Sequence, residues 1–382
     1  MSESSEPDEE LSSAPKFHTD RSHYGLAFER WFADRYPSRR DISVTDIDIP
    51  VSTGFSNETV FLDLSWTENG DAQTQRYVAR IEPTSGALFP AQTAHCSVSV
   101  EVQHRAMETV GRHCDAPVPE LLGYEADTSY IGQPFFVMGF TEGRIPADTP
   151  RYSEEGFLVD EATPEERRRM VTTGLEAMGR IHNIDWRSAD LDWLDTSGTG
   201  EPSTKVQLDL YRASTLAQLD GREHPVLDAA FEWLYANDPG DDRIGLSWGD
   251  SRLGNVIWQD YRPAAVVDWE ACALSPTEAD VGWWLMFDRM SFDEVGAARM
   301  EGFPTREEMI EIYERVSGRE VRDPHYWEVF GTMRFCAIFI GLADRMVANG
   351  LVPAEINMSV ANMVTQSLAT LLQIDNPTPS PF

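Results

Sequence analysis

The sequence predicts an α+β protein of two lobes, a small antiparallel sheet followed by a larger and mostly helical part. At 382 residues the chain is long for a single hydrophobic core. Most of the strand-like apolar runs lie before residue 140, whereas helical periodicity dominates the rest of the chain. We therefore expect a sheet lobe over residues 23–139 and a helical lobe over 140–382. The acidic, polar stretch before them, 1–22, is predicted to be a disordered leader.

The elements of the sheet lobe follow from local patterns. Apolar residues at helical spacing predict helices over 24–36 and 93–111. Short apolar and β-branched runs bounded by turn residues predict strands that begin at 47–51 and continue at 60–66, 75–81, 120–125 and 134–140. The polar residues of 52–59 suit either an ordinary hairpin or a loop that folds over nucleotide phosphates, because glycine permits close backbone approach.

The helical lobe is marked by capping signals. Thr163 and Glu166 flank Pro164 in a capping box, which predicts a helix that runs to His182. We interpret His182 as a structural residue at the end of this helix rather than as a base. Further helices are expected over 207–218, 225–236, 305–316, 326–349 and 353–373, with another beginning within 276–284.

Composition limits the partners and the compartment. The net charge of −33, from 31 basic and 64 acidic residues, disfavours nucleic acid and anionic membrane surfaces as partners. The acidity suits a cationic substrate or a general adaptation of the surface for solubility, and its spread along the chain favours the second explanation. The first residues do not resemble a signal peptide, and the four cysteines are scattered without metal-binding spacing. We therefore expect reduced thiols and a cytoplasmic location.

The stretch 247–270 concentrates the polar groups that could carry chemistry. Asp250 is followed by Asn255, and Asp268 comes after two short apolar runs separated by the turn-like residues 259–263. This pattern predicts a hairpin whose two ends lie side by side. Asn255 and Asp268 could then hold one cation, with Asp250 within reach of an incoming hydroxyl. A catalytic Asp with an Asn and a second Asp on the metal is the set that protein kinases use for phosphoryl transfer.

This stretch resembles the catalytic segment of the aminoglycoside phosphotransferase/choline kinase family, whose members phosphorylate small molecules. The family pattern of His-Gly-Asp, four residues, Asn and a hairpin that ends in Asp is matched here by 248–250, Asn255 and 268–270. The residues in these segments are most similar to those of the branch related to kinase-like domains attached to acyl-CoA dehydrogenases. Trp248 stands where the family has His, and it puts the local geometry in doubt more than the chemistry.

The resemblance implies a protein-kinase-like fold, ATP or GTP as the phosphate donor and Mg²⁺ held by Asn255 and Asp268. Glu270 is a weaker candidate for a second metal ion, and Asp280 is expected to cap a helix or to orient the catalytic loop. Arg80 would hold the phosphates, paired with Glu101 or with its rival Glu108 on the same helix. Residues implied at the nucleotide are Gly54, Ser56, Asn57, Arg80, Glu101, Phe140 and Thr141.

The expected function is transfer of the γ-phosphate to a hydroxyl group of a small molecule, with Asp250 directing that hydroxyl. The alternative is a kinase-fold binding protein without catalysis, which Trp248, the single glycine of the 52–59 loop and Arg80 would favour. Arg252 could contact the γ-phosphate or an anionic acceptor, or it could be a surface charge. The identity of the acceptor and the oligomeric state stay open.

Overall fold

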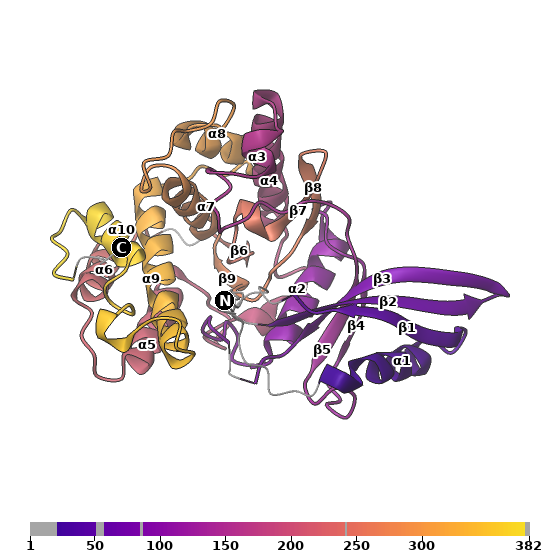
Figure 1. The fold of residues 1–382 in the computed structure, drawn as a ribbon. Helices are drawn as coiled ribbons and strands as arrows, with labels where there is room; N and C mark the ends of the chain where they lie inside the picture. Colours follow the sequence, from indigo (N-terminus) through magenta and orange to yellow (C-terminus); the bar gives the residue numbers. More distant parts are fainter. Residues whose placement is uncertain (1–20, 51–56, 85–86, 241–242, 379–382) are drawn as a thin grey trace, which may run out of the picture.

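The computed structural model describes residues 21–50, 57–84, 87–240 and 243–378. An antiparallel sheet with two helices forms one end of the molecule, and the remaining helices form the other (Figure 1). The predicted α+β architecture with a sheet lobe and a helical lobe is therefore confirmed. The predicted leader, apart from its last two residues, lies outside the described residues.

The sheet has five antiparallel strands in the order β1-β2-β3-β5-β4. Side chains that alternate along β5 point to opposite faces: Phe135 packs with the helix α1, whereas Phe136 packs with the helix α2. The two helices therefore cover opposite faces of the sheet. The elements are α1 (Tyr24–Arg35), β1 (Arg40–Asp48), β2 (Glu58–Glu68), β3 (Asp71–Ile81), α2 (Ser99–His113), β4 (Leu121–Glu125) and β5 (Phe135–Gly139).

Two predicted boundaries in this lobe are wrong. The first strand occupies Arg40–Asp48 rather than beginning at residue 47. It is an edge strand with many exposed polar side chains, so its sequence contains no apolar run that would indicate a strand. The helix predicted from residue 93 begins at Ser99, where the carboxylate of Glu82 accepts hydrogen bonds from the amides of Ser99 and Val100. Glu82, the residue directly after β3, therefore caps α2, and the N-cap residue Val98 makes no side-chain cap.

The helical lobe is built around two helix pairs, α7 with α9 and α4 with α8. The predicted capping box of Thr163 with Glu166 is present, and a second one, Thr305 with Glu308, starts the helix expected over 305–316. The helices are α3 (Phe157–Asp160), α4 (Pro164–His182), α5 (Thr204–Leu219), α6 (Pro225–Ala236), α7 (Glu278–Ser291), α8 (Arg306–Ser317), α9 (Pro324–Ala348) and α10 (Met363–Leu372). Short 3-10 helices occupy Arg21–His23, Asp192–Leu194, Leu253–Asn255 and Ala354–Ile356.

Helix α9 is the central element of this lobe and contacts α5, α6, α7 and α10. It is long and apolar enough to cross a membrane by length and composition, but 78% of its most apolar stretch is buried in the fold, as expected for a core helix. Its closest neighbour is α7, where a Cβ on Gly282 would overlap the backbone carbonyl of Trp327. Glycine at 282 is therefore needed for the two helices to pack.

The last predicted helix, 353–373, is wrong in its first half. The chain forms a 3-10 turn over Ala354–Ile356 and reverses at Asn357, whose φ of 52° is left-handed. Helix α10 then begins after Asn362, whose side chain accepts a hydrogen bond from the amide of Thr365. The two asparagines divide what the apolar pattern presents as one helix.

Candidate active site

Two short strand pairs carry the predicted catalytic stretch. Strands β6 (Ile244–Ser247) and β9 (Ala273–Pro276) pair at its base, and the predicted hairpin is formed by β7 (Val256–Gln259) and β8 (Arg262–Val266). Asp260 and Tyr261, both with positive φ, form a tighter turn than predicted. The amide of Val267 donates to the carbonyl of Asn255 at 3.0 Å. The open end of the hairpin therefore brings the backbones next to Asn255 and Asp268 together, as the sequence predicted.

Asp250 is a buried carboxylate with both oxygens engaged. The indole Nε1 of Trp283 donates to Oδ1 at 2.7 Å, and the amide Nδ2 of Asn255 donates to Oδ2 at 2.6 Å. Nε of Arg252 lies 3.3 Å from Oδ1. Donors on two sides fix the rotamer of Asp250. The carboxylate is thus pre-oriented before any ligand arrives.

Asp280, near the start of α7, holds the backbone that carries Asp250. Its carboxylate accepts hydrogen bonds from the amides of Trp248 (2.6 Å) and Gly249 (2.9 Å) and from the hydroxyl of Ser247. Nε2 of His182 lies 2.9 Å from Oδ2. Burial alone would raise the pKa of Asp280, but the hydrogen bond and charge of His182 and the Gly249 amide outweigh burial and lower the pKa.

Both structural expectations here are confirmed by these contacts: Asp280 orients the loop, and His182 is a buried helix-end residue, since Nδ1 of its ring also meets the hydroxyl of Tyr313 at 2.8 Å.

The loop is braced from two further directions. The indole of Trp248 donates to the carbonyl of Val267 at 2.9 Å, so the residue in place of the family histidine links the loop to the segment before Asp268. Arg334, a buried residue of α9, donates to the carbonyl of Gly249 at 3.0 Å, and its guanidinium lies 4.7 Å from the ring centroid of Trp283. A Cβ on Gly249, whose φ is 89°, would overlap the carbonyl of Ala271.

Trp283 and Arg334 are the residues that the sequence analysis missed. A signal for Arg334 exists in the sequence, because it interrupts the apolar face of the helix expected over 326–349. A charge on such a face points to a buried polar contact. For Trp283, three residues after Asp280, composition alone indicates only a core residue.

Asp268 lies at the boundary with the sheet lobe. Its φ of 61° is left-handed, a conformation that a residue other than glycine adopts at a cost of roughly 1 kcal/mol or more. Its Oδ1 is buried without a hydrogen bond and lies 3.5 Å from Nη2 of Arg80. Burial and the neighbouring Asp250 raise the pKa of Asp268, whereas Arg80 lowers it, and burial dominates.

A second contact crosses between the lobes beside the first. Nδ2 of Asn57 donates to Oε2 of Glu270 at 3.2 Å. Arg80 is anchored on its own lobe by a 2.7 Å hydrogen bond from Nη1 to the hydroxyl of Thr59. The sheet lobe therefore presents Arg80 and Asn57 towards Asp268 and Glu270.

The predicted partner of Arg80 is wrong. Glu101 forms an ion pair with Arg105 at 3.5 Å, and the rival Glu108 pairs with Arg112 at 2.7 Å. Both glutamates have a cation four residues further along α2, and this local pairing competes with a long-range one. In the described part of the chain Arg80 pairs with Asp268 instead.

Of the other residues predicted to contact the nucleotide, only some lie among the described residues. Gly54 and Ser56 lie outside the described residues. The amide of Phe140 donates to the carbonyl of Arg76 at 3.2 Å and is thus engaged by the sheet, while its ring lies 5.9 Å from that of Phe61. Thr141 follows directly after this strand end. Contacts of Phe140 and Thr141 with an adenine stay a prediction.

Arg252 is not the loop-surface charge that the sequence left open. Its Nη1 lies 2.7 Å from Asp148, its Nε approaches Asp250, and its guanidinium lies 5.1 Å from the ring centroid of Phe287. Burial alone would lower the pKa of Arg252, but Asp250 and Asp148 outweigh it and raise the pKa. Arg252 therefore places a permanent positive charge beside Asp250.

The oxygen donors that suit a hard divalent cation are present on one side of the site. Asn255 uses Nδ2 for its hydrogen bonds to Asp250, which leaves its amide oxygen for a ligand, and Asp268 offers the buried Oδ1. Carboxylate and amide oxygens are the ligands that Mg²⁺ accepts. Among the described residues no group of three or more His, Cys, Asp or Glu side chains is arranged to hold a metal by itself. Phosphate oxygens or waters would thus have to complete the coordination.

Known structures share this fold across nearly the whole chain. A protein from Ralstonia eutropha described as a candidate aminoglycoside phosphotransferase superposes with a TM-score of 0.67 at 21% identity, covering 92% of this chain and 98% of that one. The macrolide 2′-phosphotransferase of Brachybacterium faecium superposes with a TM-score of 0.52 at 18% identity, covering 91% and 99%. At these identities the likeness establishes the kinase-like fold alone.

Sequence comparison adds a family and a set of longer relatives. Acyl-CoA dehydrogenase family member 11 of Homo sapiens is 26% identical over 336 residues, which is 85% of this chain and 39% of that protein. The same protein of Gallus gallus is 29% identical over 329 residues, 82% of this chain and 38% of the relative. The chain thus spans about two fifths of the length of these relatives. The profile of the phosphotransferase enzyme family matches residues 49–315, and the chain belongs to this family.

Proposed function

We propose that this protein transfers the γ-phosphate of a nucleoside triphosphate, ATP in the first instance, to a hydroxyl group of a small molecule. The observation that carries the proposal is the convergence of Asp250, Asn255 and Asp268 on one end of a hairpin, with Arg80 facing Asp268 from the other lobe. Membership of the phosphotransferase family and the kinase-like fold support it. One structural relative is a GDP and kanamycin complex of APH(2")-IIia.

In this proposal Asp250 accepts a hydrogen bond from the acceptor hydroxyl and directs its oxygen in line at the phosphorus. Trp283 and Asn255 hold the carboxylate in that orientation, so little reorganisation is needed when the acceptor binds. The transition state of phosphoryl transfer is loose, and catalysis therefore depends mostly on positioning and charge. Arg252 would stabilise negative charge that develops next to Asp250.

The nucleotide would lie between the lobes. Arg80 would hold phosphate oxygens through its guanidinium fork, with Asn57 beside it as a further donor. Asn255 and Asp268 would hold Mg²⁺, which supplies charge neutralisation at the phosphates when bound. Glu270 lies next to this pair and is the candidate for assisting a second metal ion.

A thermal-shift series separates nucleotide binding from catalysis. ATP, ADP and GTP are each added with and without Mg²⁺ to the wild type, to Asp268→Ala and to Asp250→Ala. We expect ATP with Mg²⁺ to raise the melting temperature of the wild type and of Asp250→Ala, and not that of Asp268→Ala. Affinity of Asp250→Ala for ATP should stay within a few-fold of the wild type, while its turnover in an acceptor screen is lost.

Loss of ATP binding in folded Asp250→Ala would contradict the role given to Asp250. Absence of any shift with the wild type at millimolar nucleotide would favour the alternative, a kinase-fold protein that binds a small molecule without catalysis. The acceptor screen should include cationic and anionic alcohols, because the acidity of the chain suits the first and Arg252 suits the second.

A further inference from the structure

A cavity of about 540 Å³ lies in the helical lobe, and none of its lining residues belongs to the candidate active site. Four separate segments form its wall: the turn after α4, the loop before α5, the first residues of β6 and the loop after α8. Its size falls in the range of roughly 300–1,000 Å³ that is usual for small-molecule sites. The residues that matter for the argument are Trp186, Arg187, Glu201, Arg243, Ile244 and Arg319.

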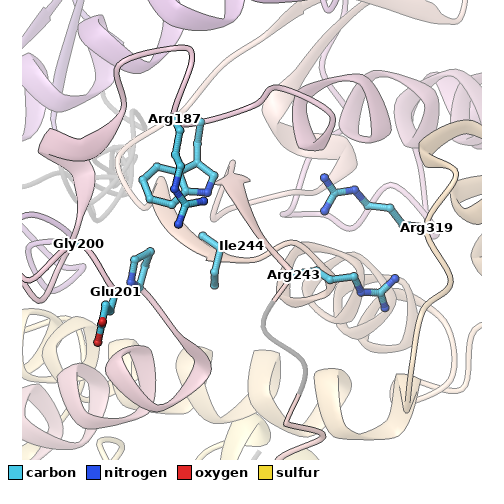
Figure 2. A pocket seen from close by; sticks show the side chains of 8 residues that line it. Arg187, Gly200, Glu201, Arg243, Ile244 and Arg319 are labelled. Atoms are coloured by element: carbon cyan, nitrogen blue, oxygen red, sulfur yellow. The ribbon is translucent and has the colours of Figure 1, made fainter.

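The wall is basic in a chain that is strongly acidic. Three arginines line it, against one acidic residue, Glu201, although the chain as a whole has 64 acidic and 31 basic residues. In Figure 2 Arg187 and Arg319 lie on opposite sides of Ile244, and the carboxylate of Glu201 points away from the arginines. Arg243 is paired with Glu278 at 2.5 Å. Over the described residues neither Arg187 nor Arg319 has a carboxylate within ion-pair distance.

Both of these guanidinium groups are held in place by neutral contacts. Arg319 donates from Nη2 to the carbonyl of His182 at 2.9 Å and has two longer contacts, at 3.4 Å, to the side chains of Asn183 and Thr277. These contacts use three of its five N–H groups, and its charge also acts on the buried carboxylate of Glu278, where it opposes the rise in pKa that burial causes. The guanidinium of Arg187 lies 4.0 Å from the ring centroid of Trp186. Positive charge and free N–H donors therefore remain for a ligand.

The side chains that line the cavity indicate which class of ligand it would bind. Guanidinium forks match the oxygens of a phosphate group, and a fork that is already oriented loses little entropy when it binds. Trp186 and Ile244 supply an apolar surface for the carbon skeleton of the same molecule. We propose that this cavity binds a small organic phosphate and that its occupation changes the rate of the reaction at Asp250.

Three connections run from the cavity wall to the loop that carries Asp250. Ile244 is the first residue of β6, which leads directly into the loop. Arg319 holds the carbonyl of His182, whose ring contacts Asp280. Asp280 in turn holds the loop amides, as described above. Arg243 pairs with Glu278, the first residue of α7 and two residues before Asp280. A ligand that pulls on these arginines acts on the groups that orient Asp250.

The binding part of the proposal is independent of catalysis, whereas the effect on rate rests on the proposed function. Binding is measured by calorimetry on the full chain with ribose 5-phosphate as the probe, ribose as its neutral counterpart and citrate as a carboxylate anion. We expect saturable binding of ribose 5-phosphate and none of ribose. Arg187→Glu and Arg319→Gln should each raise the Kd by roughly tenfold or more.

Arg315→Glu is the matched control, because Arg315 is an exposed arginine of α8 outside the cavity. It makes the same charge change as Arg187→Glu and should leave the Kd within twofold. Arg187 is exposed, so Arg187→Glu is expected to fold even if Arg319→Gln, which loses three hydrogen bonds, does not. Competition with ATP then locates the probe: binding that ATP displaces and that Arg187→Glu leaves unchanged belongs to the active site and would overturn the proposal.

No saturable binding at millimolar probe, or a Kd that Arg187→Glu leaves unchanged, would also overturn it, and tighter binding of citrate would overturn the assignment to phosphates. For the rate, saturating ribose 5-phosphate should change kcat at least twofold in the wild type and not in Arg187→Glu. Binding without that change would overturn the coupling alone. If the protein shows no phosphotransferase activity, the proposed function fails, while calorimetry still decides the cavity.

Discussion

The two sides of the candidate active site are held in different ways. Asp250 receives hydrogen bonds of 2.6 and 2.7 Å, and the loop around it is fixed by Asp280 and Arg334 from two helices of the same lobe. The side that faces the sheet lobe is held by two longer contacts between the lobes, Arg80 with Asp268 at 3.5 Å and Asn57 with Glu270 at 3.2 Å.

This difference indicates that the acceptor side and the nucleotide side of the site have different roles. The acceptor side belongs to one packed core and is rigid before ligands bind. The free-energy cost of orienting Asp250 is therefore supplied by folding and not by ligand binding. The nucleotide side is assembled from residues of both lobes through these two longer contacts, while one hydrophobic core runs from α2 and Phe136 of the sheet lobe into the helical lobe. We therefore expect the nucleotide side to adjust more on ligand binding than the acceptor side. Four substitutions test this comparison.

Asp280→Ala should have the largest effect, because it removes the acceptor of several buried hydrogen bonds and leaves His182 without its carboxylate. Loss of one partner of a buried charged network costs about 3–5 kcal/mol. We expect the free energy of unfolding in denaturant to fall by this amount and turnover to be lost. A stable variant with normal turnover would show that the loop does not depend on α7.

The same variant should alter the response to acid. The folded-state pKa of Asp280 is lowered from its ordinary value of 3.8, so the unfolded chain takes up the proton first as the pH falls. The stabilisation by Asp280 is therefore complete above the ordinary pKa and is lost as the pH falls through the folded value. In Asp280→Ala the loss of stability below about pH 4 should be shallower than in the wild type.

Trp283→Phe tests the rigidity of the acceptor side. It removes the donor to Oδ1 of Asp250 and keeps an aromatic ring beneath Arg334. A misplaced catalytic group can cost up to about 100-fold in rate, so we expect kcat to fall by roughly 10- to 100-fold with the KM for nucleotide unchanged. The matched control is Trp284→Phe, at the next position of α7, where a buried tryptophan makes no hydrogen bond to Asp250. Equal losses of kcat in both variants would contradict the positioning role.

Arg80→Gln tests the nucleotide side. The loss of the charge facing Asp268 should lower kcat/KM for the nucleotide by about tenfold, equivalent to ~1.4 kcal/mol, with little change in stability because the contact is long and lies between lobes. Arg80→Lys keeps the charge but lacks the guanidinium fork. Its kcat/KM for the nucleotide should therefore lie between those of Arg80→Gln and the wild type. A large loss of folding stability in Arg80→Gln would show that the lobes are held together more firmly than these contacts suggest.

Trp248→His should have the smallest effect. It restores the residue usual in the family and exchanges the indole hydrogen bond to Val267 for a smaller ring in a buried position. We expect a stability loss of about 1–3 kcal/mol from the cavity and a kcat within a few-fold of the wild type. A large drop in kcat, measured alongside the unfolding curve, would mean that Trp248 is needed to place Asp250.

Prediction from the sequence succeeded where the evidence is local in the chain. Asp250, Asn255 and Asp268 lie within 19 residues of one another, and the hairpin between them has its own turn and strand signals. The two capping boxes likewise specify the starts of α4 and α8 within four residues. It failed at the start of α2, where the capping contact comes from Glu82 after β3, at β1, whose side chains are mostly polar and exposed, and at 353–373, where Asn357 and Asn362 interrupt an apolar pattern.

The type of fold, the hairpin and the polar groups at its open end follow from the sequence, because short-range spacing and turn chemistry are enough to place them. Which distant groups complete the site depends on packing. Trp283 and Arg334 lie 33 and 84 residues from Asp250, and Arg80 meets Asp268 rather than a glutamate of α2. Such pairings depend on how helices and lobes pack, and many arginine–carboxylate pairs are equally plausible in the sequence until packing selects one.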